Sequence, residues 1–152
     1  MVSAFAQSFD PPQQVTDLKW MLGTWTGKGK MEMMGTAMDT SITMTTTMEG
    51  QFLKSVSVYD MGAVKMEETQ YVGWNEEKKE YTSWAFTNLA PTPRIEHGKM
   101  ENGAMVMTSE SWQGMVGRGT MKKISETKVG FLLEFQNESK WDKAMDIELT
   151  KK

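Results

Sequence analysis

The sequence contains no cysteine. Without thiols the chain has no disulfide, no thiolate metal site and no cysteine nucleophile, and its redox compartment is left open. Histidine is nearly absent as well, since His97 is the only one. Zinc and iron sites usually need several imidazole or thiolate ligands, so we predict no metal site. The chain also lacks a Gly-x-Ser-x-Gly turn and a glycine-rich loop that leads into a helix, which argues against serine hydrolases and phosphate-binding enzymes.

Charge of one sign and long apolar runs are missing too. The net charge of −3 comes from interspersed acidic and basic residues, so no basic stripe is available for nucleic acid or an anionic membrane. No apolar stretch approaches the roughly 20 residues of a membrane-spanning helix. We therefore predict neither a nucleic-acid partner nor a membrane span, and homo-oligomer formation is left open. A length of 152 residues fits one domain with a buried core.

The first residues carry one clue to location. The segment Ser3-Ala4-Phe5-Ala6-Gln7 is similar to the end of a secretory signal, with small residues before a cleavage point at Gln7. No charged or apolar region precedes it, so an ordinary N-terminal segment explains it equally well. From Ala4-Phe5-Ala6-Gln7 we predict a periplasmic or secreted protein, with a cytoplasmic one as the alternative. We expect residues 1–12 to be a disordered lead-in and residues 13–152 to be the folded domain.

Hydrophobic periodicity predicts one helix followed by strands. Apolar residues recur at helical spacing between about Pro12 and Leu22, and Gly23 is a typical helix stop. From there on the chain alternates with period two, most clearly over residues 24–33 and 36–49. Alternation of this length is typical of half-buried antiparallel strands.

Turn-forming residues then recur about every ten positions, which is the spacing of a series of hairpins. They are Met34-Gly35-Thr36, Glu49-Gly50, Met61-Gly62, Asn75-Glu76-Glu77-Lys78, the Pro91 and Pro93 segment, Glu101-Asn102-Gly103, Gln113-Gly114, Ser125-Glu126-Thr127 and Asn137-Glu138-Ser139. Asn102-Gly103 is the strongest, because both residues accept the positive φ of a tight hairpin turn. We predict an all-β, antiparallel up-and-down barrel of about ten strands, with a short N-terminal helix capping one end. Gly27, Gly29, Gly117 and Gly119 mark sharp bends or close backbone approaches.

Several segments resemble a known family. They are the helix-to-strand passage 18–27 around Gly23-Thr24-Trp25, the strand end 71–75, the segment 79–84 and the closing strand 145–152. Together these are similar to the DUF1579 family of bacterial proteins, which has no established activity, and to lipocalin-like barrels of the calycin superfamily. The resemblance implies a barrel with a pocket. The nitrobindins, a related ten-stranded group, bind haem through a histidine near the C-terminus; this chain has none there, so we expect no haem and no other cofactor.

Tryptophan and methionine are abundant, at 6 and 16 residues. Methionine is flexible and polarisable and therefore suits an adaptable apolar pocket, although filling of the core explains any single one as well. We predict that the barrel cavity binds a small hydrophobic or amphipathic ligand. The predicted binding residues are Trp25, Met44, Trp84, Met107 and Trp112 for the apolar wall, and Glu68, Tyr71, Glu110 and Arg118 for a polar end. The mid-strand charged residues face the cavity in one strand register and solvent in the other.

Two other functions stay open at this stage. One is a structural or protein-interaction module with a filled barrel. The other is an enzyme that uses Glu68, Glu110 or His97 as an acid or base, although no catalytic residue is assigned. A carboxylate deep in the cavity with a displaced titration favours the enzyme, and empty space inside the barrel favours ligand binding over a filled module.

Overall fold

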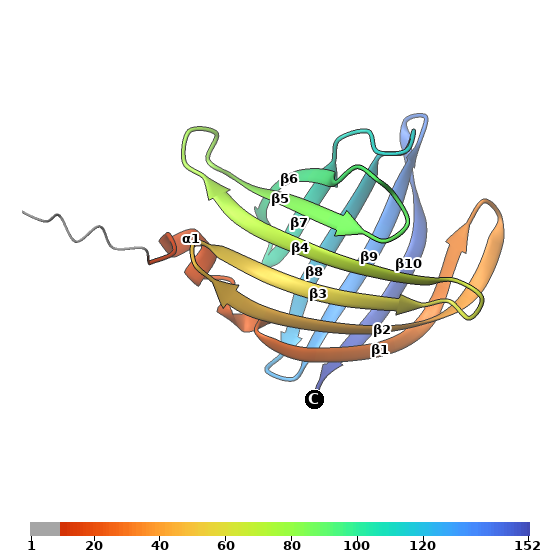
Figure 1. Ribbon diagram of the computed structural model, residues 1–152, viewed down its shortest axis with the longest axis horizontal. Helices are drawn as coiled ribbons and strands as arrows, with labels where there is room; N and C mark the ends of the chain where they lie inside the picture. Colours follow the sequence, from red (N-terminus) through yellow and green to blue (C-terminus); the bar gives the residue numbers. More distant parts are fainter. Residues whose placement is uncertain (1–9) are drawn as a thin grey trace, which may run out of the picture.

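Ten antiparallel strands close into one barrel in the computed structural model, which describes residues 10–152 (Figure 1). The strands are β1 (Gly23–Met33), β2 (Thr36–Glu49), β3 (Phe52–Asp60), β4 (Lys65–Asn75), β5 (Glu80–Thr87), β6 (Arg94–Glu101), β7 (Ala104–Ser109), β8 (Gly117–Ser125), β9 (Lys128–Asn137) and β10 (Lys140–Lys151). Each strand pairs with its neighbours in sequence, and β10 pairs with β1 to complete the cylinder. The predicted fold class is confirmed. The predicted cleavage site before Gln7 lies outside the described residues.

The predicted N-terminal helix is present as two short pieces rather than one. The first is α1 (Gln13–Thr16), and the second is a 3-10 helix, η1 (Lys19–Met21). Val15, Leu18 and Met21 are buried and are spaced by three residues. Residues three apart eclipse one another in a 3-10 helix, whereas a continuous α-helix would rotate Met21 away from Val15. The short N-terminal helix that the sequence predicts is therefore present, as an α-helical turn followed by a 3-10 turn.

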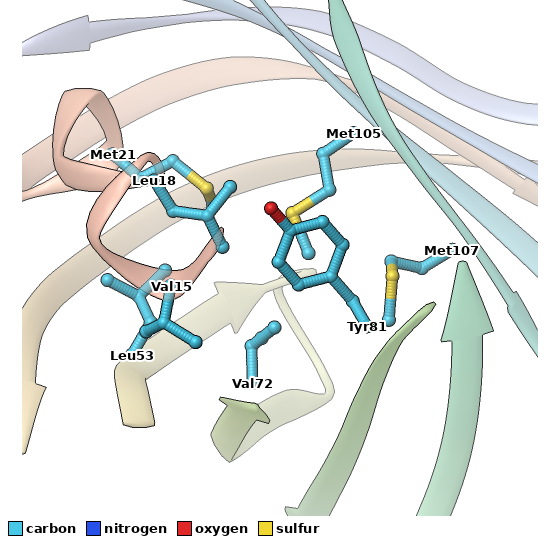
Figure 2. Close-up of a cluster of buried hydrophobic side chains, with 8 residues drawn as sticks. All are labelled: Val15, Leu18, Met21, Leu53, Val72, Tyr81, Met105 and Met107. Carbon is cyan, nitrogen blue, oxygen red and sulfur yellow. The ribbon is translucent and has the colours of Figure 1, made fainter. Parts of the chain in front are cut away.

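The apolar side of this helical segment plugs one end of the barrel (Figure 2). Val15 and Leu18 are 0% exposed. They pack against side chains from β3, β4, β5 and β7, which are Leu53, Val72, Tyr81, Met105 and Met107. The Tyr81 hydroxyl donates a hydrogen bond to the Gln14 carbonyl oxygen at 2.8 Å. We call this end of the barrel the plugged end.

Trp25 joins the plug to the first strand. Its side chain is buried, and its indole Nε1 donates to the Met21 carbonyl oxygen at 2.8 Å. The Lys151 ammonium lies 5.3 Å from the centroid of the Trp25 ring, and the backbone N–H of Lys152 donates to the Thr24 carbonyl. The start of β1, the end of β10 and the plug are therefore held together at one place.

All nine connections between strands fall where the turn signals predict them. At Asn102-Gly103 both residues have positive φ, 50° and 77°, which confirms the tight turn. The connections at residues 34–35, 61–64, 88–93, 110–116 and 138–139 lie at the end of the barrel opposite the plug. We call this the open end.

The glycines of β1 allow the barrel to close. A Cβ on Gly27 would lie 2.6 Å from the carbonyl oxygen of Glu148, which confirms the predicted close backbone approach there. Gly117 and Gly119 differ, because the nearest atoms to an added Cβ belong to phenylalanine rings at 3.4 and 3.8 Å. These two glycines leave space inside the barrel instead.

Candidate functional site

The inward faces of the strands enclose a cavity of about 240 Å³ between the plugged and open ends. Ten methionines line it: Met21, Met31, Met33, Met44, Met61, Met66, Met105, Met107, Met115 and Met121. Rings add to the apolar surface, from Tyr59, Trp112, Phe131 and Phe135. Typical small-molecule pockets measure about 300–1,000 Å³. The space therefore suits a ligand smaller than most drug-sized molecules.

A cluster of polar side chains interrupts this apolar lining on β4, β5 and β6. It consists of Glu68, Gln70, Ser83, Arg94 and Glu96, and we call it the polar wall. Arg94 lies between the two carboxylates: its Nη1 is 2.9 Å from Glu68 Oε2, and its Nε donates to Glu96 Oε1 at 3.3 Å. The charged groups of the cavity lining thus lie on one side, and outside the polar wall the lining is apolar apart from Ser55, Ser57, Ser109 and the Tyr59 hydroxyl.

Glu96 is well provided with donors. Its Oε2 accepts from Ser83 Oγ at 2.8 Å and from Gln70 Nε2, while its Oε1 accepts from Arg94. The same Gln70 Nε2 also donates to Ser83 Oγ at 3.0 Å. A carboxylate with three donors is stable when buried.

Glu68 is in the opposite situation. Only 5% of it is exposed, and its Oε2 has no hydrogen-bond partner. Its 2.9 Å contact with Arg94 Nη1 is an ion pair, and no other described residue offers this oxygen a hydrogen-bond donor. Burial raises the pKa of Glu68, and the charge of Arg94 opposes that rise. Glu68 is therefore a buried acceptor that lacks a donor.

Two aromatic residues flank the polar wall. Burial, and then the charge of Glu68, raise the pKa of Tyr59, which keeps its phenol protonated. On the open-end side, the Arg94 guanidinium lies 5.6 Å from the centroid of the Trp112 ring. The Trp112 indole in turn donates to the Thr92 carbonyl at 2.9 Å. The loops 88–93 and 110–116 are thereby joined beside the polar wall.

The structure places four of the nine predicted binding residues at the cavity. Met44, Glu68, Met107 and Trp112 line it. Trp25, on β1, is buried in the core next to the plug and is not part of the lining. The structure gives the placement of the four lining residues, and their role in binding a ligand stays a prediction.

The other four predicted residues lie outside the cavity. Tyr71 and Trp84 are on the outer face, where each packs edge-on against the Phe52 ring at 6.3 Å between centroids. Arg118 falls between two inward glycines and therefore points outward, where it pairs with Glu134 at 2.8 Å.

Glu110 lies outside the cavity, directly after the end of β7. It is exposed and lies 2.9 Å from His97 Nε2, while His97 Nδ1 contacts Glu80 at the same distance. If the alternation of β7 continued, Glu110 and Trp112 would lie on the same face of the strand. However, β7 ends at Ser109. The loop that follows turns Trp112 into the cavity and leaves Glu110 outside.

Sequence reasoning missed most of the polar wall. Arg94 and Glu96 alternate on one face of β6, and that pattern was available as a signal. Knowing which face points inward also requires the register of β6 on β5, which places Glu96 opposite Ser83. A single strand read alone does not supply that register.

The fold and its cavity define a class: a closed ten-stranded antiparallel barrel that fits a lipocalin-like fold. The chain matches no family model and no curated protein. Among solved structures it is similar to the crystal structure of Rv2717c from M. tuberculosis, with a TM-score of 0.69 and 12% identity, over 94% of this chain and 99% of that one. At this identity the likeness shows the fold alone, and the DUF1579 and calycin relationships stay predictions. No helix in the described part of the chain is long and apolar enough to cross a membrane.

Proposed function

We propose that this protein binds a small hydrophobic or amphipathic molecule in its barrel cavity. The observation that carries the proposal is the cavity of about 240 Å³, with its methionine lining and one polar wall. Methionine side chains adapt to the shape of an apolar guest. Concave, mostly apolar sites with a few placed polar groups are the usual form of small-molecule sites.

The two alternatives raised by the sequence are less well supported. A filled barrel does not describe an interior that retains this cavity. An enzyme is favoured by Glu68, because it is a deep carboxylate with a raised pKa. We prefer a binding protein, because the ion pair with Arg94 accounts for Glu68 without any reaction.

A cavity-filling variant tests the proposal. Gly119 lines the cavity, and a Cβ there meets only a Phe131 ring atom at 3.8 Å, an ordinary contact. In Gly119→Leu the remaining side-chain atoms enter the cavity and occupy the ligand's volume. Calorimetric titration with octan-1-ol is expected to show binding to the wild type and none to Gly119→Leu.

The matched control places the same side chain on the outside of the barrel. Gly130 on β9 faces away from the cavity, and its nearest neighbour is Ile124 at 3.6 Å. Gly130→Leu should bind octan-1-ol like the wild type. If folded Gly119→Leu binds as tightly as Gly130→Leu, the cavity is not the binding site.

A further inference from the structure

The charged groups that line the cavity are unequal in number. Among the described residues at the cavity surface, Glu68 and Glu96 carry carboxylates and Arg94 carries the one guanidinium. With both carboxylates ionised, the polar wall has an excess of one negative charge. Charge in a low-dielectric interior is costly unless it is paired.

Hydrogen-bond donors in the polar wall are also largely used. Arg94 directs two of its nitrogens at the carboxylates, and Ser83 donates to Glu96. Gln70 Nε2 donates twice, which leaves its carbonyl oxygen as an acceptor. Glu68 Oε2 lacks a hydrogen bond altogether. Within the polar wall, acceptors therefore exceed donors, and the hydroxyl groups of the cavity lining belong to Ser55, Ser57, Tyr59 and Ser109.

We infer that the cavity selects a ligand whose polar end is a protonated amine and disfavours one that ends in a carboxylate. The inference rests on the proposed function and names its ligand class. An ammonium group brings three N–H donors and a positive charge, which satisfies Glu68 and balances the polar wall. A ligand carboxylate adds a third negative charge beside Glu68 and Glu96, and Arg94, whose guanidinium already faces both glutamates, is the one cation of the lining that could offset it.

The preference for an amine should depend on pH, because protonation of Glu68 removes its negative charge. The titratable or charged groups that face Glu68 are Tyr59 on β3 and Arg94 and Glu96 on β6. Tyr59 stays neutral, so Glu68 is the group that changes charge as the solution becomes more acidic. Because burial raises the pKa of Glu68, this carboxyl takes up its proton at a higher pH than an ordinary glutamate and then no longer pairs with the ammonium. Amine binding is therefore expected to weaken toward acid pH.

Three probes with the same tail separate charge from apolar contact. Octylamine, octan-1-ol and octanoate are titrated into the wild type by calorimetry at neutral pH. Octylamine is expected to bind about tenfold or more tighter than octanoate, because losing a buried charge contact has an effect of at least this size. The affinity of octan-1-ol should lie between the two.

A matched pair of variants locates the effect. Glu68→Gln removes the cavity carboxylate, and Glu134→Gln removes a carboxylate of the outer ion pair with Arg118. Glu68→Gln should lose most of the preference for octylamine over octanoate, while Glu134→Gln should keep that preference and the wild-type affinity for octan-1-ol. A second measurement stands if Glu68→Gln does not fold: octylamine binding to the wild type should weaken as the solution is made more acidic, where alkylamines stay protonated, and octan-1-ol binding should not.

The outcomes distinguish this inference from the proposed function. Octan-1-ol binding together with octanoate as tight as octylamine overturns the amine preference and leaves a ligand-binding barrel. A preference for octylamine that Glu134→Gln abolishes, or that is unchanged in Glu68→Gln, overturns the role of the polar wall. If none of the three probes binds, the proposed function fails as well.

Discussion

Arg94 pairs with two glutamates in the wall of a cavity, and burying these three charges carries a desolvation cost. Removing charged groups from water costs several kcal/mol per ion, and a buried ion pair often does no better than apolar residues of the same size. Methionines make up much of the lining around the polar wall. A charged cluster in such surroundings is what the proposed binding function predicts, because it gives a ligand's polar group a partner inside an apolar cavity.

The raised pKa of Glu68 predicts how it affects folding. Because the folded-state pKa exceeds the ordinary value of 4.5, the folded protein binds this proton more tightly than the unfolded chain does. The contribution of Glu68 to the free energy of unfolding is therefore fully present below pH 4.5 and is lost as pH rises through the folded-state value. The loss is about 1.4 kcal/mol for each unit of the shift.

Urea unfolding of the wild type and Glu68→Gln across this range measures the contribution. The wild type should lose stability relative to Glu68→Gln as pH increases above 4.5, since glutamine does not titrate. A difference that stays flat means that the charge of Arg94 cancels the effect of burial on the pKa, and one that grows in favour of the wild type means that it outweighs burial.

At the scale of elements, barrel closure depends on the contact between β1 and β10. Adjacent strands elsewhere are joined by short turns, but these two come from opposite ends of the chain. Gly27 and Gly29 leave room for the Glu148 carbonyl and the Ile147 side chain, which lie 2.6 and 2.2 Å from where a Cβ would stand. The glycines therefore decide how closely the last strand fits against the first.

Alanine at Gly27 should destabilise the protein. The added methyl group meets the Glu148 carbonyl oxygen, a backbone atom that cannot move aside alone, and overpacking of this kind costs about 1–3 kcal/mol. Gly119→Ala is the control, because its Cβ meets only a ring atom at 3.8 Å. Urea midpoints should fall for Gly27→Ala and stay near the wild type for Gly119→Ala; equal midpoints would show that β10 shifts at little cost.

Much of the fold, and less of the site, could be predicted from the sequence. Period-two alternation and turn residues act within one strand or hairpin, so they identify the strands and all nine connections. Which face of a strand points inward depends on its neighbours, and a shift by one residue exchanges the two faces. The sequence predicts both Glu68 and Arg118 at the polar end of the ligand site; Glu68 lines the cavity, but the guanidinium beside it belongs to Arg94.

Strand ends account for another part of the error. Arg94 is the first residue of β6 and follows Pro93, so no alternating residues before it indicate which face its side chain is on. Trp112 follows the end of β7, and its position depends on the hydrogen bond to the Thr92 carbonyl from a loop about twenty residues earlier. Contacts between distant loops carry no periodic signal, and the cavity is bordered by such loops at its open end.

At the scale of the whole molecule, the two ends of the barrel differ. The plugged end is sealed by Val15, Leu18 and Met21, and the Tyr81 hydroxyl holds the plug through Gln14. The open end is bordered by loops whose apolar residues, such as Met61, belong to the cavity lining. If the proposed function holds, we expect the ligand to enter through the open end, since entry there does not require the packed plug to come apart.

The absence of cysteine makes this route measurable, because one introduced thiol reports one position. Met61→Cys and Met66→Cys place thiols near the open end, and Met21→Cys and Met105→Cys place them at the plug, where the native side chains are 6% and 4% exposed. A polar thiol reagent should label the first pair faster than the second, since reaction at the plug requires local opening of packed side chains. Saturation with octan-1-ol should slow labelling of Met66→Cys and leave a thiol on the outer strand face, Val56→Cys, unaffected. If Met21→Cys reacts as fast as Met61→Cys, the helical segment opens as a lid, and the entry route lies at the end with the plug.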